Sequence, residues 1–185
     1  MTAISFMAGE LTLAAVWILV RAAVCIRNRR ADWKREALLL LMYVNLAVLL
    51  RIVFYPMEKL NGHVQPLWFE PDAVFPLRVN PVPFVHILEY DSLRDTLLNI
   101  IGNAAIFVPT GIILPILYKR LNSLRRVTAS GAGMSLAIEL MQLPFAVRAS
   151  DVDDLILNTL GCAAGYGIYC FVRKHLFSKR IRKEK

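Results

Sequence analysis

The chain has 185 residues, of which 57% are hydrophobic, and a formal net charge of +8 at pH 7. Soluble domains carry about 45–50% apolar residues, so this composition indicates a membrane protein and excludes a large soluble core. The three cysteines show no CxxC spacing and lie in or at the ends of apolar segments. They therefore indicate neither a disulfide framework nor a zinc site.

Five apolar segments have nearly the length of roughly 20 residues that an α-helix needs to cross about 30 Å of hydrocarbon. They comprise residues 4–26, 37–55, 97–118, 127–147 and 152–172. The sequence therefore predicts an all-α fold, a polytopic membrane helical bundle with five transmembrane helices. Residues 1–185 are expected to form a single membrane domain.

Basic residues gather in alternate connections, after the first, third and fifth helices, whereas acidic residues gather in the other two connections. Cytoplasmic loops are enriched in Lys and Arg, so we expect the N-terminus outside and the C-terminus inside. No basic residue precedes the first segment, so we expect a retained helix and not a signal peptide. Residues 173–185 then form a basic cytoplasmic tail, whose expected partner is anionic lipid and not nucleic acid.

The long outer connection between the second and third helices, residues 56–95, holds six of the nine prolines. These prolines exclude a long helix, and the interleaved aromatic and charged side chains suit the headgroup level of a bilayer. We expect this loop to form a lid over the outer ends of the last three helices. The alternative is a linker that only connects.

Polar residues occur at helical spacing in the outer halves of the last three apolar segments. They form three stripes: Asn99 and Asn103, Glu139 and Gln142, and Asp154 and Asn158. At 1.5 Å per residue the five other than Asp154 lie about 3 to 12 Å below the expected outer boundary. Because polar side chains that face lipid lack partners, we expect the stripes to face one another and form a pocket that opens outward.

Four charged residues mark the expected mouth of this pocket: Arg148, Asp151, Asp153 and Asp154. Ser150 and Asp153 have capping-box spacing, so Asp153 is assigned to the start of the fifth helix. Asp151 and Asp154 share a face, and for them a salt bridge with Arg148 and a catalytic role both remain open.

The buried carboxyl of Glu139 suits general acid or base chemistry. It is expected either to be protonated in an apolar setting or to pair with Arg148 or Arg94. Together with Asp151 and Asp154 it offers oxygen ligands that suit Mg²⁺ or Ca²⁺ better than zinc. We rank an ion-pair network above that arrangement and predict no metal site and no cofactor.

Small residues and prolines predict close packing around a wet interior. Gly161 and Gly165 form a GxxxG motif, which permits close approach of two helix backbones. Pro109, Pro115 and Pro144 are expected inside helices, where the carbonyls that they free need partners from neighbours or water.

Two runs of fixed spacing resemble the VanZ-like family of bacterial membrane proteins. One is Asn99-x3-Asn103-x3-Phe107-x-Pro109-x-Gly111, and the other extends from Glu139-x2-Gln142-x5-Arg148 through Asp151, Asp154, Asn158 and Gly161 to Gly165. Upstream, Asn80-x2-Pro83-Phe84 is similar to an outer-loop element of that family, and the resemblance covers residues 78–169, taken as the VanZ-like core. It implies a multi-pass protein of the bacterial plasma membrane that is associated with resistance to the lipoglycopeptide teicoplanin.

Two classes of function remain open for the pocket. In the first it binds and modifies an envelope lipid or a lipid-linked polymer at the outer face. The catalytic candidates are Glu139, Arg148, Asp151 and Asp154, and the binding candidates are Asn80, Asn99, Asn103, Gln142 and Asn158. In the second class the pocket binds a lipid or antibiotic group without chemistry, in a transport or regulatory protein.

Overall fold

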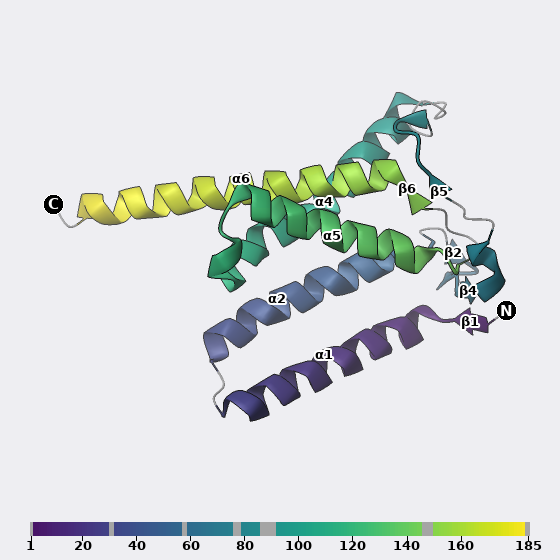
Figure 1. The fold of residues 1–185 in the computed structure, drawn as a ribbon, viewed down its shortest axis with the longest axis horizontal. Helices are drawn as coiled ribbons and strands as arrows, with labels where there is room; N and C mark the ends of the chain where they lie inside the picture. The colour runs from purple at the N-terminus through teal and green to yellow at the C-terminus, as the bar shows by residue number, and fades with distance from the viewer. Residues whose placement is uncertain are drawn as a thin grey trace. The chain divides into compact units, whose positions relative to one another are not determined.

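The computed structural model describes residues 2–29, 32–56, 59–75, 79–85, 92–145 and 150–183. Within these ranges the longest elements are five α-helices (Figure 1). They are α1 (Phe6–Asn28), α2 (Trp33–Leu49), α4 (Leu93–Leu117), α5 (Leu124–Gln142) and α6 (Val152–Lys183). The prediction of an all-α helical membrane protein is confirmed.

Four of the described helical stretches are long and apolar enough to cross a bilayer. They are Phe6–Asn28, Trp33–Phe54, Leu93–Leu117 and Val152–His175. The helix predicted over 127–147 forms as α5 but does not belong to this group, because Arg125, Arg126 and Glu139 lower its apolar character. The structure thus supports four of the five predicted spans by length and composition.

The ends of the helices differ from the predicted ends where polar residues cap them. α2 starts at Trp33 because the Asp32 carboxylate accepts from the backbone N–H groups of Lys34 and Arg35. In the same way Ser92 caps the start of α4. α5 ends at Gln142, so Pro144 follows the helix and is not inside it as expected; proline removes an N–H donor and disfavours helix in the residue before it.

The chain forms two compact units. The first comprises Met1–Asn80 and Glu139–Ser150, and the second comprises Pro81–Ile138 and Asp151–Lys185. Each unit is described by itself below. The C-terminal turn of α5, from Glu139 on, belongs to the first unit.

In the first unit α1 and α2 form an antiparallel hairpin (Figure 1). Trp17 meets Tyr43 at 5.7 Å between ring centroids, and Phe6 meets Tyr55 at 5.4 Å. The Tyr55 hydroxyl donates to the Ser5 carbonyl oxygen at 3.1 Å, and Tyr55 is 1% exposed. This contact fixes the open end of the hairpin, where α2 finishes in a π-helical turn over Leu50–Phe54.

The described part of the outer loop contains short strands, which pair with one another or with segments outside the loop. β1 (Thr2–Ile4) pairs with β4 (Leu67–Phe69), and β2 (Lys59–Leu60) pairs with β3 (His63–Val64). Residues 61 and 62 turn the second hairpin with φ values of 51° and 79°, as an Asn-Gly turn does. A 3-10 turn covers Pro71–Val74, and β5 (Val79–Asn80) pairs with β6 (Ser150–Asp151). The loop is thus structured over these residues, whereas its function as a lid stays a prediction.

In the second unit α4 and α6 pack backbone against backbone. A Cβ atom at Gly161 would overlap the carbonyl oxygen of Ala104, and one at Gly165 would overlap that of Val108. The GxxxG motif therefore lies in a helix contact, as predicted. Contacts advance in the same direction along both helices, so α4 and α6 run parallel.

α5 packs against α6 and runs antiparallel to it. Gly131 and Val127 both approach Cys162, whose thiol lies 3.5 Å from the Val127 carbonyl oxygen. Cys162 is fully buried and not in a disulfide, and it fills the space of a small apolar residue. Within the second unit α5 therefore runs antiparallel to α4 and α6.

Candidate functional site

The second unit brings together two of the predicted binding and catalytic residues. The amide Nδ2 of Asn103 on α4 donates to Oδ1 of Asp154 on α6, with 2.5 Å between the two atoms. Asn99 lies one turn before Asn103 and is half-buried. Two of the three predicted stripes therefore meet along the α4–α6 contact.

One turn further along α6, Asn158 lies deeper in the unit. Its Nδ2 donates to the hydroxyl oxygen of Ser135 on α5 at 2.9 Å, and the two residues are 2% and 0% exposed. Among the described residues, Oδ1 of Asn158 has no hydrogen-bond partner. A buried acceptor left alone costs about 1–3 kcal/mol, so this atom marks a place that is suited to a donor from a bound molecule.

The first residues of α6 do not form the expected capping box. The acceptor for the Asp153 backbone N–H is the Asp151 carboxylate, at 2.9 Å, and not the Ser150 hydroxyl. Asp151 thereby satisfies one of the donors left unpaired at a helix start. This contact gives Asp151 a structural function that the sequence had assigned to Ser150.

Asp153 is 3% exposed, and its Oδ1 accepts from the Phe84 backbone N–H at 2.8 Å. Within the described residues its Oδ2 has no hydrogen-bond partner. Sequence reasoning assigned Asp153 only to the helix start, because its partner lies 69 positions away. The signal that could have found it is the Pro83-Phe84 element, which the family resemblance had marked.

The third stripe belongs to the first unit. Glu139 and Gln142 are 3% and 4% exposed, and Nε2 of Gln142 donates to the Val53 carbonyl oxygen at 3.0 Å. Val53 lies in the π-helical turn after α2, where the backbone hydrogen bonds change from the i→i+4 spacing of an α-helix to the i→i+5 spacing of a π-helix. Gln142 therefore supports the end of α2, which its assignment to substrate binding had not anticipated.

The remaining candidates occupy separate places. Asn80 ends β5 in the first unit and is half-buried. Arg148 lies outside the described residues. Among the described residues, no three His, Cys, Asp or Glu side chains are grouped closely enough to hold a metal ion. A pocket formed by all three stripes stays a prediction, since the stripes belong to different units.

Comparison with known proteins shows the family of the chain. A model of the VanZ/LLP1 family matches residues 37–173. The chain belongs to the VanZ/LLP1 family. This confirms the resemblance seen in the sequence, and the matched range includes most of α2 as well as the VanZ-like core of residues 78–169.

Within the VanZ/LLP1 family, the chain is similar to Protein VanZ of Enterococcus faecium. The two are 34% identical over 83 residues, which cover 45% of this chain and 51% of that protein. The chain thus matches about half the length of this curated relative. No solved structure matches the chain.

Proposed function

We propose that the chain is a multi-pass protein of the bacterial plasma membrane that binds the polar group of an envelope lipid or lipid-linked polymer. The binding residues are a polar cluster in the second unit, composed of Asn103, Ser135, Asp153, Asp154 and Asn158. Its expected effect is lower susceptibility to lipoglycopeptides such as teicoplanin. The similarity to Protein VanZ and the resemblance in the sequence support that effect.

The observation that carries this proposal is the Oδ1 atom of Asn158, a buried acceptor without a partner among the described residues. It lies on the same helix face as Asp154, one turn away, where α6 contacts α5. Polar groups in such surroundings need a functional reason, because an unsatisfied one destabilises the fold.

The chemistry of the cluster indicates what it binds. Carboxylate and amide oxygens accept hydrogen bonds, and they predominate in this cluster. The described donors are the Ser135 hydroxyl and the two amide Nδ2 groups, of which that of Asn103 donates to Asp154 and that of Asn158 donates to Ser135. The ligand group that complements these acceptors is rich in hydrogen-bond donors, such as the hydroxyls of a saccharide or an ammonium group. An anionic group would instead need Arg148 or another cation at the site.

Binding without chemistry is the simpler form of this proposal, because the hydrogen bond from Asn103 engages the Asp154 carboxylate. If the chain is an enzyme, Asp154 or Glu139 is the acid or base, and an envelope component changes its composition when the chain is expressed. If it is a binder, susceptibility changes without a new product. Comparing the envelope-lipid profile with and without expression separates the two.

The test uses Asn158→Leu and Asp154→Asn beside Leu160→Ala as the control. Leu160 lies on the same helix and is 58% exposed, so the control leaves the cluster intact. We expect Asn158→Leu to abolish the change in teicoplanin susceptibility and the copurified lipid seen by native mass spectrometry, whereas Leu160→Ala retains both. Asp154→Asn keeps an acceptor for Asn103 and isolates the effect of the charge. The proposal would be overturned if both site variants, at the protein level of the unmodified chain, gave the same teicoplanin susceptibility and the same copurified lipid as the unmodified chain.

A further inference from the structure

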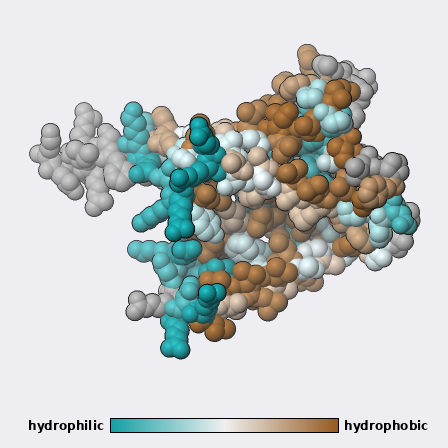
Figure 2. Space-filling model, viewed as in Figure 1, coloured by the Kyte–Doolittle hydropathy of each residue, from teal (hydrophilic) through white to brown (hydrophobic). Residues whose placement is uncertain are grey.

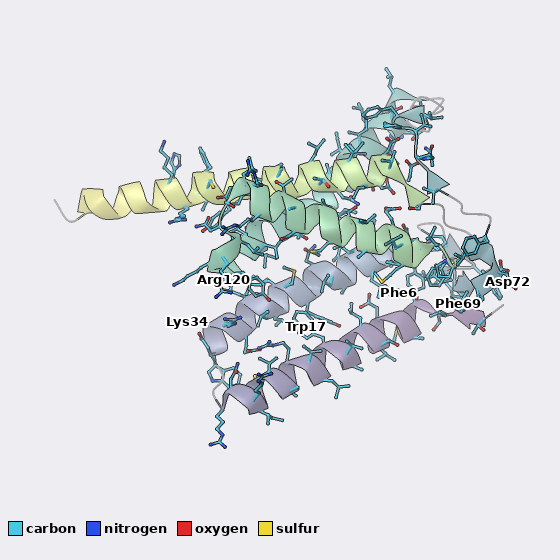
Figure 3. The ribbon with its side chains drawn as sticks, viewed as in Figure 1. Phe6, Trp17, Lys34, Phe69, Asp72 and Arg120 are labelled. Carbon is cyan, nitrogen blue, oxygen red and sulfur yellow. The ribbon has the colours of Figure 1, made fainter. Side chains whose placement is uncertain are left out.

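A groove separates α1 from α2 in the half of the hairpin nearest its turn. Its volume is about 570 Å³, within the roughly 300–1,000 Å³ of ligand pockets. Both helices line it, mainly with apolar atoms: Trp17, Arg21 and Cys25 from α1, and Trp33, Glu36 and Leu40 from α2. The stick view places Trp17 between the two helices (Figure 3).

An ion pair closes the interior of this groove. Nε of Arg21 donates to Oε2 of Glu36 at 3.0 Å, and Nη2 of Arg21 contacts Oε1 of the same carboxylate. The bidentate pair joins α1 to α2 across the groove, with more defined geometry than a single hydrogen bond gives.

The walls of the groove continue onto an exposed apolar surface. Ile18 is 64% exposed, Leu40 is 57% exposed and Trp33 is 81% exposed, and no residue of α1 is buried. In a membrane span this surface faces hydrocarbon. An indole ring at the end of a span is the usual anchor at the level of lipid headgroups.

Cations surround the turn where the groove ends. Arg27 and Arg29 follow the α1 wall, and Lys34 and Arg35 follow Trp33 on the α2 wall; all four are exposed. Hydrophilic residues gather at this end of the hairpin, and hydrophobic residues extend along its flank (Figure 2). An apolar groove that ends in a cluster of positive charge matches one molecule in both parts: a lipid with an acyl chain and an anionic phosphate.

We propose that the α1–α2 groove binds one anionic phospholipid. An acyl chain lies between the Trp17 and Trp33 walls, and the phosphate contacts the cations of the turn. The site lies in the first unit and shares no residue with the polar cluster, so it goes beyond the proposed function and can fail independently of it. It also assigns a function to α1, all of which precedes the family match.

The groove contains its own reporters, because two of the three tryptophans line it. In a Trp68→Phe background, selective excitation of tryptophan reports on Trp17 and Trp33 alone, and a brominated acyl chain in the groove brings bromine atoms close to both. The full chain is placed in nanodiscs of unlabelled phosphatidylcholine. Brominated phosphatidylglycerol or brominated phosphatidylcholine is then added at the same low mole fraction, and the quenching is compared.

We expect phosphatidylglycerol to quench more strongly than phosphatidylcholine. The ratio of quenching should fall to about one in Arg27→Gln/Lys34→Gln, which removes two exposed cations of the turn. The matched control, Lys119→Gln/Arg120→Gln, removes two exposed cations of the second unit and should retain the ratio. Ala22→Phe fills the groove from its α1 wall and should lower quenching by both lipids.

Equal quenching by the two lipids in the unmodified background would overturn the proposal. So would a ratio that is unchanged in Arg27→Gln/Lys34→Gln, or full quenching in Ala22→Phe. If a second copy of the chain fills the groove, quenching is insensitive to the headgroup and rises when the protein is diluted, which also contradicts lipid binding.

Discussion

The Asp153 carboxylate holds the backbone N–H of Phe84, with 2.8 Å between Oδ1 and N. Phe84 has φ of 67°, in the left-handed region that a residue with a Cβ atom adopts at a cost of about 1–2 kcal/mol. Such a backbone conformation persists only where the surrounding structure holds it, and here the buried Asp153 side chain does so. Asp153 therefore fixes the loop after Pro83 to the start of α6.

Removing this acceptor should destabilise the second unit. Asp153→Ala leaves the Phe84 N–H without its partner, at an expected cost of about 1.5–3 kcal/mol, because the lost bond is to a charged group. Asp153→Asn keeps an oxygen acceptor and should cost about half as much. Denaturant unfolding of the purified protein in mixed micelles measures both.

Two further substitutions separate the Phe84 contact from helix capping. Asp151→Asn retains a good cap and should change stability by only a few tenths of a kcal/mol. Phe84→Gly relieves the left-handed strain while removing a half-exposed ring, so its net effect should stay within about 1 kcal/mol. An Asp153→Ala variant as stable as the unmodified chain would show that the contact does not contribute to stability.

The local pattern of apolar residues predicted the helices well, because each helix depends on its own apolar run. This local pattern did not predict the contacts between segments that are far apart in the sequence. The pairing of Thr2–Ile4 with Leu67–Phe69 joins two pieces of backbone that have no shared periodicity, and the Asp153 contact has the same character. The Asn103–Asp154 hydrogen bond was foreseeable because helical spacing places each residue in a polar stripe, and two such stripes gain by meeting.

The close contact of α4 and α6 predicts a steep cost for a single methyl group. At Gly161 or Gly165 the added Cβ would meet a backbone carbonyl of α4, which cannot rotate away as a side chain does. We expect Gly161→Ala and Gly165→Ala each to cost about 1–3 kcal/mol, the usual range for overpacking, or more.

Gly133→Ala is the matched control for this prediction. Nothing lies within 4 Å of a Cβ atom there, and Gly133 is also inside a helix of the second unit. Helix propensity alone should then make this variant more stable by about 0.5–1 kcal/mol. Opposite signs at Gly133 and Gly161 in one thermal unfolding series would support the contact, and equal signs would contradict it.

Tyr55 should link the ends of α1 and α2 through its hydroxyl. Tyr55→Phe keeps the ring contact with Phe6 and removes only the bond to the Ser5 carbonyl oxygen, so it should cost about 0.5–1.5 kcal/mol. The same variant should speed amide hydrogen exchange near the start of α1 and leave exchange in α4 unchanged. Uniform exchange changes along the whole chain would argue against this local function.

Gln142 should act as a clamp on the end of α2. Gln142→Leu has nearly the same volume but leaves the Val53 carbonyl without its side-chain donor, so we expect a loss of about 1–3 kcal/mol. Gln142→Glu removes the donor as well and brings a buried charge, so it should be worse than leucine. Met141→Ala is the control, since its side chain is 54% exposed and lies on the other side of α5. If Gln142 served only to bind a ligand, Gln142→Leu would unfold at the same denaturant concentration as the unmodified chain, and lipid binding alone would change.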